Sequence, residues 1–533
     1  IVRRLILSSI TSGIFLFIIN NIFQYYSFRI SLIYLPQLII FTIGLRLLFK
    51  FYILSSQNNR ENILIFGAGE AGRRLLTLIN FSKEFSPQGF IDDSYELKGK
   101  LIDSLKVFHS DELENIIIKK KINKVLIAIP SAKPQEKQNI FNRLEKLNIS
   151  CQTVPDLRKI VLGEAKINEL NSINVEEIIS RHRINSVSDK ALKVIKNKNI
   201  LITGAGGSIG SEIVKKIIFL KPKKILLFEI SEFALYKMNQ EINQIIINNK
   251  LSDTQVLDIL GSIQNKTLVN KILEKHHINI IFHAAAYKHV PLLENNVVEA
   301  VKNNIFGTKV IAESAIKNKV DILSMISTDK AVNPSNIMGS TKRIAELICQ
   351  QACQNQKHTS LSIVRFGNVV GSSGSVVPLF QKQIEDGGPV TITHKDVTRY
   401  LMSITEAAIL VIEACTIPDN DEICFLEMGE PIKILDLAIK MIKLKGLNYN
   451  MIEKTKDNKE TINIRFTGLR PGEKLNEELH ISNQISLTEN PLIKKVFEKK
   501  PNINALNSLL DDLEKESELN NSLQLRELLN ISF

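Results

Sequence analysis

Four consecutive polar residues near the middle of the chain have side chains of the types needed for proton transfer. An apolar run at 320–326, which predicts a buried strand, leads directly into Ser327, Thr328, Asp329 and Lys330. The carboxyl ends of strands are where α/β sheets present reactive groups, and a carboxyl beside an amine can serve as an acid and a base. The alternative is a polar turn that caps the next helix. These four residues alone do not decide between the two.

A glycine-rich turn earlier in the chain has the pattern of a phosphate-binding site. The apolar run at 199–203 leads into such a turn at 204–210, and a helical pattern begins at Ser211. Glycines let the backbone approach a pyrophosphate, and the helix N-terminus offers unpaired N–H groups. We therefore predict a dinucleotide site. Its first cofactor-binding candidates are Gly204, Gly207, Ser208, Ile209 and Gly210.

The strands after this turn supply further cofactor candidates. The run at 224–228 ends in Glu229, whose carboxylate can bind the adenosine ribose and would repel a 2′-phosphate. NAD is therefore favoured over NADP. The other candidates end two later strands: Asp258 and Ile259 beside the adenine, and Ala284 and Ala286, whose small side chains leave room for the cofactor.

A second glycine turn lies nearer the N-terminus. A short apolar run at 62–66 leads into Gly67-Ala-Gly69-Glu-Ala-Gly72, and Asp92 follows about 20 residues later. This is the spacing at which an acid can bond a ribose hydroxyl. Two interpretations stay open, a nucleotide site and a Rossmann-like fold without a ligand.

Composition excludes several classes of protein. The chain has 533 residues, 44% of them hydrophobic and 23% charged, which is ordinary for a folded protein with two to four domains. Half of the net charge of +12 comes from residues 1–60, where basic residues flank apolar runs, a pattern of membrane orientation rather than of nucleic-acid binding. The five Cys form no CxxC pair, so we expect reduced thiols and no metal site.

The N-terminal region has the pattern of a membrane hairpin. Apolar runs at 5–19 and 30–45 are each short against the roughly 20 residues of a spanning helix, but both can be extended. Arg and Lys before and after the pair place both ends in the cytosol. A signal peptide followed by a core helix is the alternative. The chain begins with Ile rather than Met, so we expect missing residues and further spans before it.

These patterns predict an α/β protein with two Rossmann-like, doubly wound parallel sheets after the membrane segment. The expected parts are a transmembrane segment at 1–55, a first Rossmann-like domain at 60–150, a linker at 151–195, a second Rossmann-like domain at 196–490 and a helical tail at 491–533. One stripe of the tail carries four leucines, which predicts either core packing or self-association. These are Leu506, Leu509, Leu510 and Leu513.

Several long motifs in order resemble one family. They include TGAGGSIG, HAAAYKHVPLLE, STDKAVNPSNIMGSTKR and GLRPGEKLNEEL. The chain is similar to the membrane-anchored nucleotide-sugar 4,6-dehydratases of bacterial polysaccharide and glycan biosynthesis, within the extended short-chain dehydrogenase/reductase (SDR) superfamily. The resemblance implies an extended SDR fold, NAD as cofactor and a UDP-sugar, typically UDP-N-acetylglucosamine, as substrate. It also implies a homo-oligomer at the lipid of the bacterial inner membrane, with the catalytic domain in the cytosol.

One position distinguishes this branch of the superfamily. The superfamily usually has Tyr-x-x-x-Lys, in which the Tyr exchanges a proton with the sugar, whereas here the stretch runs from Met338 to Lys342. The resemblance implies that Lys342 holds the nicotinamide ribose. Met338 cannot transfer a proton, but the membrane-anchored dehydratases also have Met here, so it supports the assignment.

The resemblance also assigns the proton-transfer roles. Asp329 would protonate the leaving C6 hydroxyl, Lys330 would take the C5 proton, and Thr328 would bond the C4 oxygen. A lysine that acts as a base needs a lowered pKa, which burial or a neighbouring cation can supply.

Substrate-binding candidates lie on both sides of this motif. For His289 a structural role is the alternative, and the motif context alone favours substrate binding for the arginines. The set is Lys288, His289, Asn368 for a phosphate or sugar oxygen, Arg399 and Arg470 for the diphosphate, and Glu473 for the uridine ribose.

Two rival functions remain. A C4 epimerase or a decarboxylase of nucleotide sugars would use the same fold, but an epimerase needs the Tyr and needs no acid at C6. A non-catalytic membrane sensor would bind the cofactor without turnover, and Met338 is its best argument.

Overall fold

The structure is a computed structural model that describes residues 60–153 and 184–530 with short gaps, together with isolated positions before residue 60. The predicted membrane hairpin and most of the predicted linker lie outside the described residues. Within the part that is described, no helix is both long and apolar enough to cross a membrane. The chain divides into two compact units, one of residues 1–130 and 152–171 and the other of residues 131–151 and 172–533.

The first unit contains a mainly parallel sheet with strand order β3-β4-β2-β1-β5. The central strand β1 is buried from Ile63 to Phe66. Its sequence is a continuous apolar run because a parallel strand covered on both faces exposes no side to water. The elements are β1 (Glu61–Phe66), α3 (Glu70–Asn80), β2 (Phe85–Asp92), β3 (Leu101–Ile102), β4 (Leu105–His109), α4 (Leu113–Lys120) and β5 (Lys124–Ile127). After them, α5 (Pro134–Lys146) clusters with the second unit, and β6 (Ser150–Thr153) spans the boundary.

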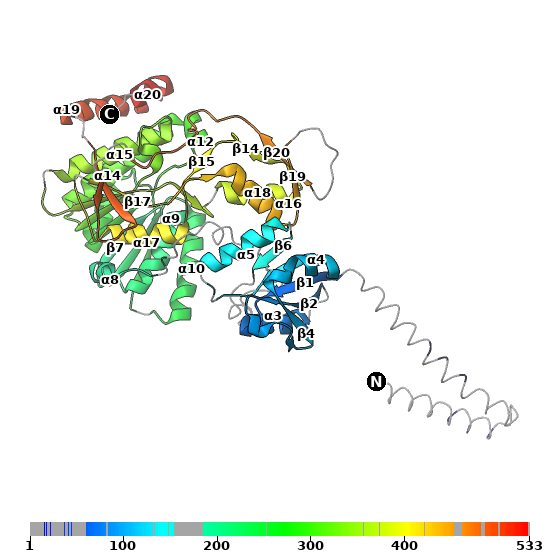
Figure 1. Ribbon diagram of the computed structural model, residues 1–533. Helices are drawn as coiled ribbons and strands as arrows, with labels where there is room; N and C mark the ends of the chain where they lie inside the picture. The colour runs from blue at the N-terminus through cyan, green and yellow to red at the C-terminus, as the bar shows by residue number, and fades with distance from the viewer. Residues whose placement is uncertain are drawn as a thin grey trace. The chain divides into compact units, whose positions relative to one another are not determined.

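The second unit is built on a nine-stranded sheet with order β21-β22-β17-β12-β11-β10-β7-β8-β9. Figure 1 shows the ribbon of this unit, with its strands among helices. All of its strand pairs are parallel except those of β22 with β17 and with β21. The strands are β7 (Asn199–Thr203), β8 (Lys224–Glu229), β9 (Gln255–Leu260), β10 (Ile280–His283), β11 (Ile322–Ile326), β12 (Ser360–Arg365), β17 (Glu422–Leu426), β21 (Ile485–Leu487) and β22 (Ile493–Phe497).

Helices cover both faces of this sheet, which makes it doubly wound as the sequence predicted. Along β7, Leu201 packs into the core under α11, α14 and α15, while Ile200 and Ile202 pack into the core under α9, α10 and α17. The covering helices are α9 (Ser208–Ile217), α10 (Glu232–Asn249), α11 (Lys266–His276), α14 (Gly307–Lys317), α15 (Ile337–Gln354) and α17 (Ile404–Ala414).

A smaller substructure in the C-terminal half has its own core, which includes Phe380, Val390, Leu437 and Ile464. Its sheets are β14-β20-β19, β13-β16 and β15-β18. The elements are β13 (Asn368–Val370), α16 (Val376–Glu385), β14 (Val390–Ile392), β15 (Thr398–Arg399), β16 (Leu401–Ser403), β18 (Ile432–Lys433), α18 (Ile434–Leu444), β19 (Asn448–Asn450) and β20 (Thr461–Phe466).

The C-terminal segment differs from the predicted helical tail. Its first part is β22, which pairs with β17 because Ile493 and Val496 are apolar enough to be fully buried in the central sheet. The helices α19 (Ile503–Glu518) and α20 (Ser522–Leu529) follow. The predicted leucine stripe of α19 is buried in the main core, so core packing accounts for this pattern.

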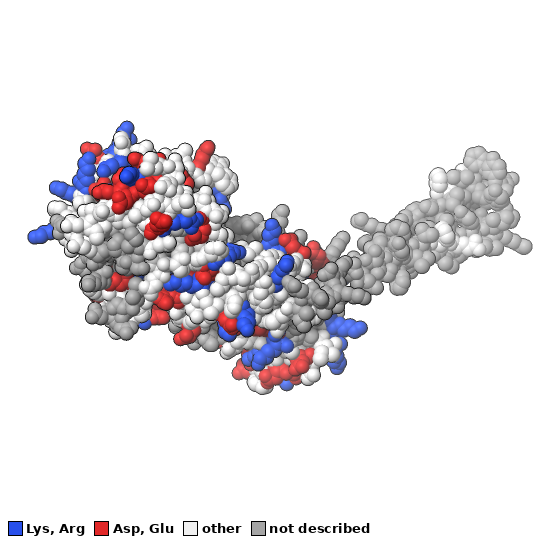
Figure 2. All heavy atoms as spheres, turned by 90° about the horizontal axis from the view of Figure 1, so that it is seen from above, with Lys and Arg blue, Asp and Glu red and all other residues white. Residues whose placement is uncertain are grey.

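Charge is mixed over the described surface. In the view of Figure 2, Lys and Arg lie among Asp and Glu rather than forming one extended basic area on this face. Electrostatic attraction to nucleic acid needs a continuous basic surface. This face offers none within the residues described.

Candidate functional site

The glycine turn after β7 is closely packed against its surroundings. Gly204 has a φ of +67°, a left-handed conformation that favours glycine, and a Cβ there would lie 2.8 Å from the Cα of Ala285. A Cβ on Gly210 would lie only 2.1 Å from the carbonyl oxygen of Gly204. The turn therefore brings strand β7 and helix α9 closer together than any other residue type allows.

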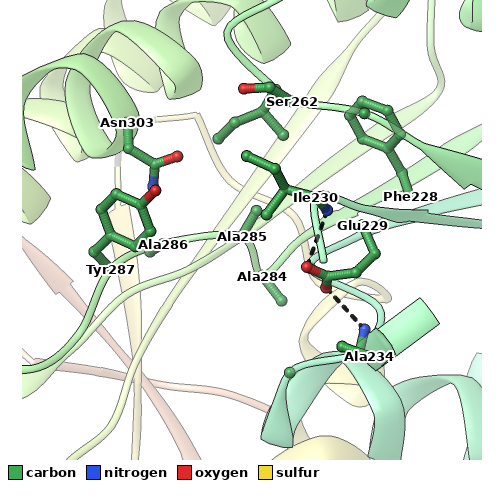
Figure 3. A pocket seen from close by; sticks show the side chains of 15 residues that line it. Phe228, Glu229, Ile230, Ala234, Ser262, Ala284, Ala285, Ala286, Tyr287 and Asn303 are labelled. Atoms are coloured by element: carbon green, nitrogen blue, oxygen red, sulfur yellow. Dashed lines mark hydrogen bonds between the residues drawn. The ribbon is translucent and has the colours of Figure 1, made fainter. Parts of the chain in front are cut away.

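Glu229 at the end of β8 is held in place by backbone N–H groups. Its Oε2 accepts from the amide of Gly206 at 3.0 Å, and its Oε1 accepts from the amides of Ile230 at 3.0 Å and Ser231 at 3.1 Å. Figure 3 shows this carboxylate at the wall of a pocket. The carboxylate of Glu229 is therefore held at the end of β8, the position predicted from the sequence for the acid that binds the ribose.

The pocket lies over the carboxyl ends of four strands, β7, β8, β9 and β10. The predicted Ala284 and Ala286 line it, but Asp258 and Ile259 do not. Asp258 accepts a hydrogen bond from Asn239 of α10 instead, and burial raises its pKa. Gly261, Ser262 and Ile263 line the pocket in place of Asp258 and Ile259, because β9 continues to Leu260 before the chain turns toward the pocket. The lining is Gly204, Gly206, Gly207, Phe228, Glu229, Ile230, Ala234, Gly261, Ser262, Ile263, Ala284, Ala285, Ala286, Tyr287 and Asn303.

A buried histidine supports this wall. The Nδ1 of His283 lies 2.8 Å from Thr203 Oγ1, and its Nε2 lies 3.0 Å from Thr308 Oγ1. Burial, with a smaller contribution from Lys342, lowers the pKa of His283 to about 3, so the imidazole is neutral. Asn304 then holds the loop, because it accepts from the amide of Tyr287 at 2.9 Å and donates to its carbonyl at 3.0 Å. No motif in the sequence indicated these supporting roles.

The predicted proton-transfer residues cluster at the carboxyl end of β11. Thr328 Oγ1 donates to Asp329 Oδ1 at 2.9 Å, and Lys330 Nζ lies 2.9 Å from the same oxygen. Lys330 also donates to Asn368 Oδ1 at 3.2 Å. Asp329 is fully buried, and within the described structure its Oδ2 has no hydrogen-bond partner. The sequence therefore identified four residues that the fold brings into contact.

One prediction about this cluster is wrong. A lowered pKa was expected for Lys330, but its pKa is raised. Burial favours the neutral amine, yet the carboxylates of Asp329 and Glu477 outweigh burial, the latter with Oε1 3.6 Å from Nζ. Glu477, which is buried, was not among the candidates. Its only signal was its place in the acid-rich 468–479 motif.

Lys342 and Met338 lie one turn apart on α15. Lys342 Nζ donates to the carbonyl oxygen of Ile326, the last residue of β11, at 2.7 Å. Burial lowers the pKa of Lys342 to about 8, with Glu346 opposing the shift. Met338 is buried in the main core. Lys342 therefore lies under the same sheet edge as the proton-transfer cluster.

Three of the substrate candidates lie at one place. The buried Arg399 pairs with Glu473 at 2.9 Å, and its other nitrogen donates to backbone carbonyls. The amide of Arg470 donates to Glu473 Oε2 at 3.1 Å. The guanidinium of Arg399 is thus held by Glu473 and by backbone carbonyls, and its role at a diphosphate stays a prediction. The side chain of Arg470 is exposed.

Lys288 and His289 follow the pocket wall. The ring of His289 packs so closely on Gly374 that a Cβ there would lie 2.6 Å from the ring. Burial lowers the pKa of both side chains, and Lys288 adds to the effect on His289. The close packing gives His289 a structural role as well.

The first unit repeats the same construction. Asp92 at the end of β2 accepts from the amide of Ala68 in the glycine turn at 2.8 Å and from the amide of Ser94 at 2.9 Å. A Cβ on Gly72 would lie 1.9 Å from the carbonyl oxygen of Gly67. The strand, turn, helix and acid predicted here are all present. The two interpretations of this turn stay open.

Comparison with known proteins follows this division. Residues 200–498 match the family described as polysaccharide biosynthesis protein, and residues 62–144 match the PglD N-terminal domain. The chain is 38% identical to the capsular polysaccharide biosynthesis protein CapD of Staphylococcus aureus over 442 residues, 82% of this chain and 71% of that protein. It is 32% identical to a UDP-glucose 4-epimerase of Rickettsia canadensis over 55% of this chain and 80% of that enzyme.

Among solved structures, Pen from Bacillus thuringiensis is 33% identical and covers 58% of this chain and 89% of its own, with a TM-score of 0.50. The family match spans the residues of the glycine turn and of the proton-transfer cluster. The chain therefore belongs to this family of polysaccharide biosynthesis proteins.

Proposed function

We propose that the chain catalyses the NAD-dependent 4,6-dehydration of a UDP-N-acetylhexosamine, foremost UDP-N-acetylglucosamine. The product is a 4-keto-6-deoxy sugar for bacterial polysaccharide or glycan synthesis. The observation that carries the proposal is the contact of Thr328, Asp329 and Lys330 at the edge of the sheet where the dinucleotide-type pocket opens. The similarity to CapD supports the pathway.

The pocket fits a dinucleotide. Its floor consists of glycines 204, 206 and 207, whose missing side chains leave backbone exposed, and Glu229 presents a carboxylate that a 2′-phosphate would meet. The 204–210 turn, Glu229, the 284–286 wall and Lys342 would hold NAD. When bound, NAD accepts a hydride from C4 of the sugar and returns it to C6, so the reaction involves no net oxidation.

The residues of this chain then move protons. As C4 loses its hydride, its hydroxyl proton passes by way of the Thr328 hydroxyl to Asp329. The neutral form of Lys330 takes the proton from C5, the C6–O bond breaks, and Asp329 gives the proton it received to the departing oxygen, which leaves as water. Lys330 returns its proton to C5 when the hydride has returned to C6. Thr328 occupies Oδ1 of Asp329, so the unpartnered Oδ2 is the oxygen that can carry the transferred proton. In this proposal the hydroxyl of Thr328 also forms a hydrogen bond with the C4 oxygen of the sugar.

Met338 and the acid at C6 distinguish dehydration from epimerisation. A C4 epimerase, as the Rickettsia relative is named, needs no proton donor for C6. Here the position of the usual Tyr is a buried Met338, and the proposed acid is the buried Asp329. We keep epimerisation as the second candidate because of that relative.

We propose further that residues 1–55 anchor the catalytic unit in the lipid of the bacterial inner membrane, on its cytosolic side, as a homo-oligomer. The support for the anchor and its orientation is the pair of apolar runs flanked by Arg and Lys, and the homo-oligomer is what the family resemblance implies.

The test uses the whole 533-residue chain with UDP-N-acetylglucosamine and a catalytic amount of NAD, followed by mass spectrometry of the sugar nucleotide. We expect the loss of one water without accumulation of NADH, abolished by Lys330→Ala and retained by Lys494→Ala, a lysine paired with Glu427 outside the cluster. An isomerised sugar of unchanged mass would identify an epimerase. Binding of NAD with no turnover of any UDP-sugar would support the sensor.

A further inference from the structure

Two arginines and two glutamates lie together in the interior of the second unit. The exposed fractions of Arg365 and Glu346 are both 0%, and Arg343 and Glu498 are buried as well. Arg365 ends β12, Arg343 and Glu346 lie on α15, and Glu498 follows β22 directly. Burial of four charges is costly unless each is paired, and none of the four has a role in the proposed chemistry. We call these residues the buried charge cluster.

The contacts within the buried charge cluster pair every carboxylate oxygen. Arg365 binds Glu346 through Nε at 2.8 Å and Nη2 at 2.6 Å, and it binds Glu498 through Nη1 at 2.6 Å and Nη2 at 2.9 Å. Arg343 Nη1 lies 3.1 Å from Glu346 and 2.8 Å from Glu498. Burial alone would raise the pKa of Glu346, but the two guanidinium groups lower it to about 2. The four residues of the cluster are therefore charged, and the guanidinium of Arg365 holds each of the two carboxylates through two hydrogen bonds.

Ser327 connects the cluster to the proton-transfer residues. Its hydroxyl donates to Glu346 Oε1 at 2.6 Å, and its amide donates to the carbonyl of Val364, next to Arg365. Ser327 is buried and directly precedes Thr328. The segment is therefore attached to the cluster by its side chain and to β12 by its backbone.

Two further functional residues, Lys342 and Asn368, lie close in sequence to residues of the buried charge cluster. Lys342 lies one helical turn before Glu346 on α15. Arg365 is followed within three residues by Asn368, and the intervening Phe366 accepts from the amide of Asp329 at 3.0 Å. The 327–330 segment, Lys342 and Asn368 thus each lie next to or contact a residue of the cluster.

We propose that the buried charge cluster acts through Ser327 to position the 327–330 segment for catalysis, and that Glu498 makes the C-terminal segment part of this support. The four residues are positioning residues, because none of them reaches the proposed reacting atoms. The proposal rests on the proposed function only for its kinetic consequence.

The first test measures amide hydrogen exchange of the whole chain, which requires no turnover. We expect Glu498→Gln and Ser327→Ala each to raise exchange in the 327–331 peptide by about tenfold or more. Glu413→Gln is the matched control, since Glu413 is also a buried carboxylate but accepts from the hydroxyl of Ser188 at 2.7 Å. Unchanged exchange in 327–331 for Ser327→Ala would overturn the proposal, even if Glu498→Gln did not fold.

The second test measures kcat and KM with the sugar nucleotide that the wild-type chain turns over. We expect kcat to fall about 10- to 100-fold in each single variant, with KM changed less than about twofold. A small displacement of the proton-transfer residues slows the chemical step more than it weakens binding of the substrate. In the double variant the losses should combine to much less than their product, since both act through one contact. A purely stabilising cluster would lower the melting temperature and leave kcat per folded molecule unchanged. A wild-type chain without turnover would refute the proposed function, and hydrogen exchange would still decide the positioning role.

Discussion

Lys330 is held in its charged form by two carboxylates, although its proposed task is to take a proton. Asp329 lies 2.9 Å and Glu477 lies 3.6 Å from its Nζ, and their combined effect raises its pKa. Glu477 follows Arg470 and Glu473 in the same 468–479 segment, which also carries substrate candidates. A substrate that contacts this segment can therefore influence the proton affinity of Lys330.

Replacing Glu477 should show this coupling. In Glu477→Gln one of the two carboxylates is removed, so the pKa of Lys330 falls and the neutral amine forms at lower pH. We expect the limb of the kcat profile that rises with pH to move to lower pH. The measurement is the dependence of dehydration rate on pH. Glu478→Gln is the control, since Glu478 is exposed and accepts from Asn333. An equal shift in both variants would contradict the role of Glu477.

Lys342 makes the stability of the fold dependent on pH. Its pKa is lowered from 10.5 to about 8 by burial, so the folded protein binds this proton less tightly than the unfolded chain. Below pH 8 the lysine is charged in both states, and its burial costs about 3 kcal/mol. Between pH 8 and 10.5 the free energy of unfolding should rise with pH by about that amount.

Lys342→Met tests this prediction by urea unfolding at several pH values. We expect the variant to lack the rise between pH 8 and 10.5 and to have lost turnover. A variant with the wild-type pH dependence of unfolding would assign that rise to another group. If the variant lacks both the rise and turnover, function accounts for a buried lysine that weakens the fold at neutral pH.

At the scale of elements, the packing of α9 against the glycine turn limits which residues fit. In Gly210→Ala the new Cβ would lie 2.1 Å from the Gly204 carbonyl oxygen, so the helix must move away from β7. We expect a loss of about 1–3 kcal/mol in unfolding free energy and at least tenfold weaker NAD binding by calorimetry. Gly207→Ala is the graded comparison, because its Cβ would lie 3.2 Å from the same oxygen. Equal effects of the two variants would exclude this steric explanation.

Elements defined by local patterns could be predicted from the sequence, whereas contacts between distant segments could not. The glycine turn with Glu229 and the strand before Thr328 each depend on fewer than about 30 consecutive residues. Glu477 contacts Lys330 although the two residues are nearly 150 positions apart in the sequence. The sequence of β22 resembles the rest of the C-terminal segment, and only its pairing with β17 identifies it as a strand of the central sheet. The prediction of a lowered pKa for Lys330 was wrong because the carboxylate of the neighbouring Asp329, together with the distant one of Glu477, outweighs burial.

At the scale of the whole molecule, the C-terminal helices belong to the main core. Leu513 of α19 is fully buried in the same core as Leu201 of β7, the strand before the glycine turn. Leu513→Ala should therefore lower the free energy of unfolding of this unit by about 2–5 kcal/mol. Leu519→Ala is the control, because Leu519 is 65% exposed and should change stability by less than about 0.5 kcal/mol. Equal losses on denaturant unfolding would place α19 outside the cooperative core.

The position of Glu498 has a consequence for how the protein is made. A ribosome synthesises Arg343 and Arg365 long before Glu498, so a nascent chain without Glu498 has only one of the two carboxylates that pair with these guanidinium groups. A product that ends between residues 479 and 498, because of a premature stop codon for example, retains every proposed proton-transfer residue but lacks this counter-charge. Such a fragment is expected to be cleared by proteases rather than to compete for sugar nucleotides as a partly active enzyme.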